Sequence, residues 1–224
     1  MKLNFILAES ALELIPKEAL GFPAVRNDSR RREVEPSKML LDRSLHHSAM
    51  TKLKDSERRG RPDLVHVALL SVTATPLHLE GNVRIFVHTY NDIVIEIAER
   101  TRLPKSYSRF RGLMESVLAG DDGSGLVRAR NETFRNLLNG LSSDLVLGLS
   151  VQGRKAGVDE AAEMIVKSKA PSVVVGGFPR GHFSRTILSE LDELIRFGEV
   201  PLEAQTAAAR LIYEVEKASV RIND

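Results

Sequence analysis

A proline between two charges, Arg61-Pro62-Asp63, stands immediately before a long apolar run. Proline suits the first position of a helix, where its missing N–H is not needed. A carboxylate in the first turn, here that of Asp63, interacts favourably with the helix dipole. The pattern therefore predicts a helix that begins at this point, and it raises the question whether Arg61 also binds a ligand.

A glycine-rich turn follows an apolar run in the stretch SVVVGGFPRGHFS, residues 172–184. Gly176, Gly177 and Gly181 would let the backbone approach a ligand at the carboxyl end of a parallel strand. The pattern is neither the dinucleotide fingerprint GxGxxG nor a P-loop, because no GK[ST] follows. A nucleoside-type ligand without a triphosphate fits such a turn, and a tight strand-to-helix connection fits it equally well.

A second loop pattern lies at residues 197–201, between an apolar segment that we interpret as the end of a helix and a new helix starting at Leu202. Short loops of this kind can present backbone N–H and C=O groups to an adenine edge. Most of them, however, are plain connections, so this segment alone does not predict a site.

Basic residues concentrate between residues 100 and 111, with two aromatic side chains among them. No Asp or Glu lies between Thr101 and Met114 to pair with these cations. A helix after Pro104 would place Lys105 and Arg109 on one face, because they are four residues apart. Positive charge beside aromatic rings suits a phosphate backbone and a stacked base, so the cluster favours RNA binding over a merely solvated helix face. The cations are Arg100, Arg102, Lys105, Arg109 and Arg111, and the rings are Tyr107 and Phe110.

Two adjacent histidines, His46 and His47, lie between Ser44 and Ser48 and invite a catalytic or metal-binding interpretation. Neighbouring residues on a helix or a strand point in different directions, so adjacent histidines serve one metal ion poorly. The chain has no cysteine, and no triad of acidic residues lies near this pair. We therefore expect polar packing at the end of an element and no metal site.

Composition narrows the class of protein. The 224 residues include 32 Lys and Arg against 30 Asp and Glu, a net charge of +2, so any basic surface must be local. The absence of cysteine excludes disulfides, iron–sulfur clusters and thiolate zinc sites, and it fits a reducing cytoplasm. No apolar run approaches the roughly 20 residues needed to span a bilayer. The N-terminus, with Glu9 and Glu13, is interpreted as a strand running into a helix and not as a signal peptide.

The elements that must position these groups follow an α/β pattern. Residues Leu3–Ala8 are a compact apolar run typical of a buried strand, and residues 9–16 look like the start of a helix. Residues 25–38 are highly charged and favour an exposed loop over an ordered segment. Residues 82–90 and 92–99 alternate apolar and polar side chains, which predicts a hairpin. Helices are expected at 61–72, 106–120, 131–141, 158–169, 184–198 and 202–219.

The apolar runs at 144–150 and 170–179 are separated by one of these helices. Strand, helix, strand, helix, short segment, helix is the layout of an α/β domain with a mainly parallel sheet.

Six stretches spread over nearly the whole chain carry a family resemblance: NFILAESALELIP, HHSAMTKL, RGRPDLVHVALL, RLPKSYSRFRGLM, VVVGGFP and PLEAQTAAARLIYEVE. With them the chain resembles the ribosome-biogenesis pseudouridine N1-methyltransferases of the SPOUT class, the Emg/Mra family, in its short archaeal form. The resemblance implies one SPOUT domain over residues 1–224, with a mainly parallel sheet, helices on both faces and a C-terminal trefoil knot at about 142–224, an exception to the rule against threaded loops. It also implies a family-specific insertion around 25–60 and a hairpin with a basic helix around 83–119.

The activity implied by this resemblance is S-adenosylmethionine-dependent methylation of N1 of a pseudouridine in small-subunit ribosomal RNA, with S-adenosylhomocysteine as product. The family members are homodimers and assist assembly of the small subunit, and we expect a cytoplasmic protein without a membrane or metal partner. Two alternatives stay open: an RNA-binding assembly factor without catalysis, and a SPOUT methyltransferase that acts on another base.

Site residues are implied by matching the family motifs to this sequence. Arg61, Arg102, Lys105 and Arg109 match RNA contacts, and Asp63 matches the acid that holds Arg61 in place. Lysine at 105, where some members have arginine, keeps the charge but weakens a bidentate contact. The cofactor-binding residues implied are Leu149, Gly176, Gly177, Gly181, Arg196, Phe197, Gly198, Glu199, Val200, Pro201 and Leu202.

The chemistry needs an acceptor for the proton on N1 of pseudouridine. A carboxylate or a water molecule could take it. Asp63 is one candidate, although we expect it to be engaged by Arg61, and Asp92 in the predicted hairpin turn is another. Most of the catalytic effect is expected from proximity, with the base flipped out and held against the methyl group.

Overall fold

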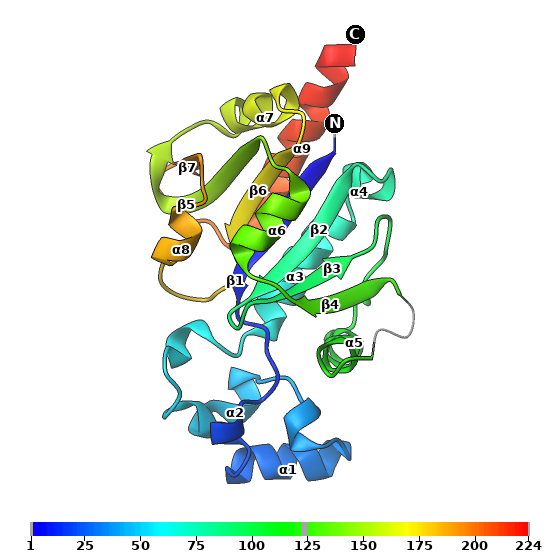
Figure 1. Cartoon of the computed structure of the whole chain (residues 1–224), viewed down its shortest axis with the longest axis vertical. Helices are drawn as coiled ribbons and strands as arrows, with labels where there is room; N and C mark the ends of the chain where they lie inside the picture. The colour runs from blue at the N-terminus through cyan, green and yellow to red at the C-terminus, as the bar shows by residue number, and fades with distance from the viewer. Residues whose placement is uncertain (1, 122–124, 224) are drawn as a thin grey trace.

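The structure, a computed structural model, describes residues 2–121 and 125–223. Within these residues a seven-stranded sheet has the order β4-β3-β2-β1-β6-β5-β7 (Figure 1). The pairs β2–β3 and β3–β4 are antiparallel, and the other neighbouring strands are parallel. The strands are β1 Leu3–Ser10, β2 Val83–Thr89, β3 Ile93–Ile97, β4 Val127–Asn131, β5 Leu145–Lys155, β6 Pro171–Gly176 and β7 Glu193–Arg196.

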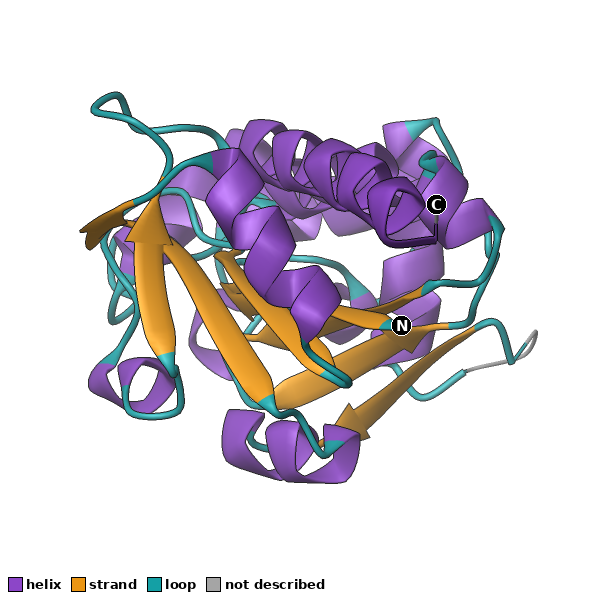
Figure 2. Ribbon diagram, turned by 90° about the horizontal axis from the view of Figure 1, so that it is seen from above, coloured by secondary structure: helices purple, strands orange, loops and turns teal. Residues whose placement is uncertain are grey.

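Helices cover both faces of this sheet (Figure 2). The α-helices are α1 Pro23–Arg32, α2 Arg43–Met50, α3 Pro62–Thr73, α4 Pro76–Leu79, α5 Tyr107–Leu118, α6 Phe134–Leu141, α7 Val158–Lys167, α8 Arg185–Leu188 and α9 Ala204–Asn223. Three short 3₁₀ helices are η1 Lys17–Ala19, η2 Pro36–Lys38 and η3 Ser56–Arg58. The mainly parallel α/β architecture expected from the sequence is therefore confirmed.

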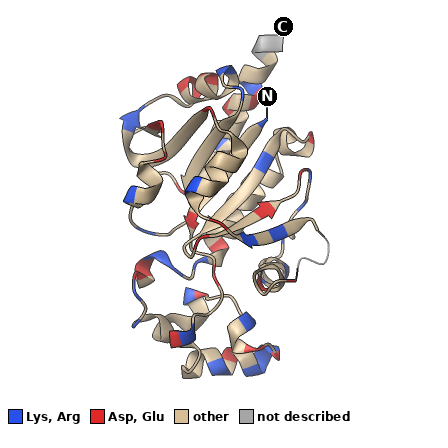
Figure 3. Ribbon diagram, in the orientation of Figure 1, with Lys and Arg blue, Asp and Glu red and all other residues tan. Residues whose placement is uncertain are grey.

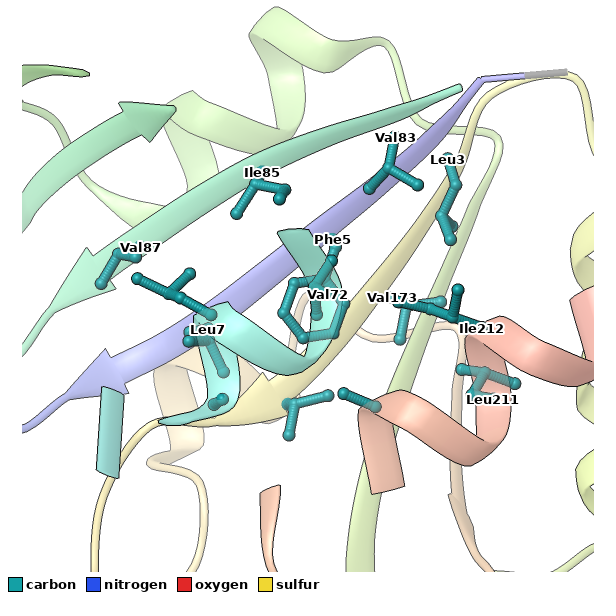
Figure 4. Close-up of a cluster of buried hydrophobic side chains, with 14 of the residues drawn as sticks. Leu3, Phe5, Leu7, Val72, Val83, Ile85, Val87, Val173, Leu211 and Ile212 are labelled. Carbon is teal, nitrogen blue, oxygen red and sulfur yellow. The ribbon is translucent and has the colours of Figure 1, made fainter. Parts of the chain in front are cut away.

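The central strand β1 is apolar throughout because both of its faces are buried, as is usual in parallel sheets. Leu3, Phe5 and Leu7 point to the face covered by α3 and α9, where they belong to one cluster with Val72 and Leu211 (Figure 4). The alternate residues of β1 pack on the opposite face against α6 and α8, in a second cluster. The alternation follows from the period of two along a strand.

Residues 17–58 form a separate helical module, which we call the α1–α2 module, beyond the carboxyl end of β1 (Figure 1). It has its own apolar cluster, with Val25, Leu41 and Met50 among the members. His46 is buried in α2, and its Nδ1 accepts the backbone N–H of Asp42 at 3.1 Å. Polar packing of this histidine is therefore confirmed.

The prediction of a helix at residues 9–16 is wrong. The strand β1 runs on to Ser10, and the chain then stays extended and takes its backbone partners from distant segments. Ala11 N donates to Gly177 O, and Ile15 N donates to Met39 O. Because these partners lie far away in the sequence, local periodicity gave no sign of them.

The exposed loop expected at residues 25–38 is also wrong, because α1 and η2 occupy it. Pro23 fills the first helical position. The Arg32 guanidinium forms a two-bond pair with the Glu115 carboxylate of α5, with Nη1 and Oε1 2.8 Å apart. Glu115 is buried and also accepts the N–H of Leu40 at 2.9 Å, so the charged residues of α1 attach the module to the main domain.

The helix expected at 184–198 is wrong as well. The short helix α8 and the strand β7 replace it, and β7 pairs in parallel with β5. The edge strand β4 was not expected at all, and it extends the hairpin that β2 and β3 form as predicted. The basic helix α5 begins at Tyr107, so Lys105 precedes it and does not share a helical face with Arg109.

We predict that Arg32→Ala lowers the free energy of unfolding by about 3 kcal/mol, because it leaves the buried Glu115 carboxylate without its cation. Arg31 is the matched control: it is exposed and pairs with Asp28 in the same helix, so Arg31→Ala should cost below about 1 kcal/mol. Urea denaturation of the two variants measures the difference, and equal costs would contradict the tie between α1 and α5.

Candidate functional site

A cavity of about 430 Å³ opens at the carboxyl ends of β5, β6 and β7. This is where ligands bind in open parallel sheets, and the volume lies in the range of small-molecule sites. Two loops, residues 176–183 and 196–203, form most of its wall. Arg61, Leu64 and Ala68 close it from the start of α3, and Ala207 closes it from α9.

The structure brings all the cofactor-binding residues expected from the sequence to this one cavity. They come from three separate parts of the chain, which the parallel strands bring together. Whether they hold a ligand stays a prediction. The lining residues expected are Leu149, Gly176, Gly177, Gly181, Arg196, Phe197, Gly198, Glu199, Val200, Pro201 and Leu202.

The glycines at the end of β6 also have a steric reason that the sequence did not show. A Cβ on Gly176 would lie 2.8 Å from the Phe178 ring, and one on Gly177 would lie 2.1 Å from Ser10 Oγ. Both positions therefore need glycine because protein atoms fill the space beside them. Gly181 and Gly198 have positive φ angles of 90° and 83°, which glycine adopts without strain.

Charges on the second loop neutralise one another. Arg196 and Lys155 bond to the Glu199 carboxylate and lower the pKa of Glu199 to about 2. Arg196 also donates to Gly198 O at 3.2 Å. The loop is thus held in shape by side-chain bonds from Arg196 within it and from Lys155 at the end of β5.

Arg61 and Asp63 form a bidentate pair at the mouth of the cavity. The guanidinium Nε and Nη2 lie 2.8 Å from Oδ1 and Oδ2 of Asp63, and Arg61 itself lines the cavity. Burial alone would raise the pKa of Asp63, but the bonds from Arg61 outweigh it and lower that pKa. The pair fixes the direction of an arginine that would otherwise lose up to ~2 kcal/mol of rotamer entropy on binding.

The other RNA-contact candidates, Arg102, Lys105 and Arg109, are all exposed. None of the three is paired with an acid among the residues that the structure describes. Tyr107 connects this region to the module, because its hydroxyl donates to Asp42 Oδ2 at 2.5 Å. Burial, and then that bond, raise the pKa of Tyr107.

One aromatic residue of the basic cluster is not available to a base. Phe110 is fully buried and stacks on His66, with ring centroids 4.3 Å apart. His66 Nε2 in turn lies 2.7 Å from Pro104 O, which anchors the segment before α5. The cations therefore lie on a rigid support, while base stacking on Phe110 is excluded.

Asp92 lies in the β2–β3 turn as predicted, with a φ of 53°, but it does not line the cavity. Its carboxylate bonds to His88 Nε2 at 2.9 Å. The structure therefore brings Asp63 beside the cavity and leaves Asp92 away from it. Among the described residues, no group of three or more His, Cys, Asp or Glu side chains lies close enough together to hold a metal ion.

Several lining residues were missed from the sequence. Arg180 and His182 lie on the first loop, on either side of Gly181, and Glu203 is the last residue of the second loop. Their positions next to the recognised segments were the available signal.

None of the helices in the described part of the chain is both long and apolar enough to cross a membrane.

Comparison with known proteins identifies the family. The sequence model of the EMG1/NEP1 methyltransferase family matches residues 5–216. The chain is 40% identical to the ribosomal RNA small subunit methyltransferase Nep1 of Thermococcus kodakarensis over 219 residues, which cover 96% of this chain and 98% of the relative. It is 38% identical to the protein of the same name from Methanothrix thermoacetophila, with 96% and 95% covered.

The fold agrees with a solved structure, the crystal structure of Archaeoglobus fulgidus Nep1 bound to S-adenosylhomocysteine. The TM-score is 0.86 and the sequence identity 33%, with 98% of this chain and 100% of that chain covered. The SPOUT-type α/β fold expected from the sequence is therefore confirmed. Sequence, fold and the position of the cavity agree, and the chain belongs to the EMG1/NEP1 methyltransferase family.

Proposed function

We propose that this protein transfers a methyl group from S-adenosylmethionine to N1 of a pseudouridine in small-subunit ribosomal RNA, and thereby acts in small-subunit biogenesis. The observation that carries the proposal is the cavity in which the two loops and Arg61 meet. It places a nucleoside-sized site directly beside an oriented arginine. The names of the relatives and the S-adenosylhomocysteine bound to the Archaeoglobus protein support the same reaction.

The residues present fit S-adenosylmethionine. Leu149, Ile195 and Leu202 offer apolar surface, and the glycine-rich backbone of both loops offers donors and acceptors for an adenosine. When bound, this cofactor supplies a methyl group on a sulfonium. The work of the chain is then to bind the cofactor, to hold the flipped base in line with that methyl group and to exclude alternative geometries.

The RNA partner is supported by an uneven distribution of charge. Residues 17–61 carry twelve Lys and Arg against seven Asp and Glu, a net charge of +5, although the whole chain has only +2. Figure 3 shows these cations along the α1–α2 module. Together with Arg102, Lys105 and Arg109 they make one half of the molecule attractive to phosphate.

Asp63 orients Arg61 in this mechanism and does not take the proton. A carboxylate with a lowered pKa, engaged in two hydrogen bonds, is a weak proton acceptor. Asp92 lies outside the cavity, so we assign it no catalytic role. The proton on N1 then passes to water or to Glu203, a carboxylate of the cavity wall.

Three further features belong to this proposal. The chain is knotted from about residue 142 to residue 223, the protein is a homodimer, and it works in the cytoplasm, where its ribosomal substrate is assembled. Val67 on α3 and Tyr213 on α9 are both exposed, and this apolar surface on two helices that pack together supports a protein partner.

A paired methyl-transfer assay tests the reaction. We expect methylation of an RNA that contains the pseudouridine and none of the same RNA with uridine, because N1 carries a proton only in pseudouridine. Mass spectrometry of the nucleosides identifies the product. RNA binding without transfer would favour a non-catalytic assembly factor, and methylation of both RNAs would favour an enzyme acting on another position.

The Asp63→Asn variant tests the clamp on Arg61. Without the carboxylate charge the guanidinium loses its fixed direction, so we expect RNA affinity to fall about tenfold. Affinity for S-adenosylhomocysteine should stay within about twofold, measured by calorimetry on the same samples. The matched control is Glu57→Gln, an exposed acid of the same segment; an equal loss in that variant would point to a general charge effect.

Arg109→Ala tests the phosphate contacts. Removing one such contact should lower the slope of log affinity against log salt concentration by about one unit. Lys169→Ala, at an exposed position after α7, should leave the slope unchanged. A titration of RNA binding from low to moderate salt measures both variants, and identical slopes in the three proteins would refute the contact.

A further inference from the structure

We propose that Arg58 is a positioning residue that fixes the shape of the first cavity loop through Glu9 and that loop's backbone. We call the pair of Arg58 and Glu9 the latch. The inference rests on the proposed function, because it assigns the latch to the cofactor side of the site. Neither residue lines the cavity, and neither was singled out by the sequence motifs.

One guanidinium contacts both ends of the loop. Arg58 Nη1 donates to His182 O at 2.7 Å, and its Cζ lies 4.2 Å from the centre of the Phe178 ring. Phe178 and His182 both line the cavity. Arg58 therefore holds two points of the loop wall from outside, one by a charged hydrogen bond and one by a cation–π contact.

The carboxylate of Glu9 completes the latch. Its Oε2 accepts Arg58 Nη2 at 2.8 Å and the backbone N–H of Ser184 at 3.1 Å. Ser184 is the N-cap of α8, where the loop ends. The two side chains are largely shielded, with 23% of Arg58 and 14% of Glu9 exposed, so their attraction is screened less than that of a surface pair.

Two energetically unfavourable features, one at Glu9 and one at Arg58, indicate that the latch has a role beyond stability. Glu9 has a φ of 49°, a conformation that is unfavourable for a residue with a side chain and that collects at functional sites. Arg58 Nε is buried without a hydrogen-bond partner within the described structure. An apolar side chain in place of Arg58 would avoid the buried, unpartnered Nε, whereas a guanidinium can reach the carbonyl, the ring and the carboxylate at once.

The latch also connects the two halves of the site. Arg58 is the last residue of η3 and lies only three residues before Arg61. The segment that positions Arg61, the proposed RNA contact, therefore also holds the first cavity loop. Lysine could keep the charge pair with Glu9. It could not also bond to His182 O and cover the Phe178 ring, because its ammonium is a single point of contact.

The test compares the wild type with Arg58→Ala, Arg58→Lys and the control Lys169→Ala, an exposed cation after α7 and outside the α1–α2 module. For Arg58→Ala we expect the Kd for S-adenosylhomocysteine to rise about tenfold, and the KM for S-adenosylmethionine to rise with it while kcat changes little. Arg58→Lys should recover part of the loss, and Lys169→Ala should match the wild type. The RNA affinity of Arg58→Ala should fall less than its cofactor affinity, because only one cation of the α1–α2 module is lost.

Hydrogen exchange of the amides at residues 177–184 provides a readout that needs no cofactor. In Arg58→Ala these amides, and that of Ser184 above all, should exchange faster than in the wild type, while the amides of β1 stay protected. Unchanged exchange would overturn the latch even if the wild type proved not to be a methyltransferase. Faster exchange with an unchanged cofactor Kd would show a loop contact without a positioning role, and a matching loss of RNA affinity would make Arg58 an RNA contact; either result overturns the proposal.

Discussion

The backbone of Ala11 joins the two parts of the cavity wall on which the proposed function depends. Its N–H donates to Gly177 O at 2.8 Å, and its carbonyl accepts the N–H of Arg61 at 3.0 Å. Gly177 N in turn donates to Ala8 O at 2.9 Å. The first cavity loop and Arg61 are thus bonded to neighbouring atoms of one extended segment. Buried backbone bonds of this kind are costly to break, so they fix the position of Arg61 relative to the first cavity loop.

Most of the charged side chains around this segment are held in place by a partner of opposite charge. Acids orient basic residues: Asp63 holds Arg61, and Glu9 holds Arg58. On the second loop the order is reversed, since Arg196 and Lys155 hold Glu199. Each pair neutralises charge near the cavity, which suits the adenosine part of a cofactor. The cations without such partners lie farther out, at Arg102 to Arg109, where phosphate would meet them.

Sequence reasoning succeeded where the determinants are local. The strand β1, the hairpin, the helix start at Pro62 and the glycine-rich turn follow from periodicity, turn chemistry and capping. It failed where the partner lies far along the chain. The extended residues after Ser10 bond to Gly177 and Met39, and the charged helix α1 is held by Glu115. The strand β7 is four residues long, too short for its period to be distinguished from that of a helix.

The site shows the same division. Residue patterns found the glycine-rich turn and the basic cluster, and the family resemblance assigned them to the cofactor and to RNA. Neither showed the steric contacts of Gly176 and Gly177 or the contacts that Glu9 and Arg58 make.

The central claim is that the cavity between the two loops binds the cofactor beside Arg61. A crystal structure of this protein with S-adenosylhomocysteine tests it most directly. The account predicts the ligand between residues 176–183 and 196–202, with its sulfur facing the side of Arg61; a ligand bound anywhere else on the molecule would contradict it.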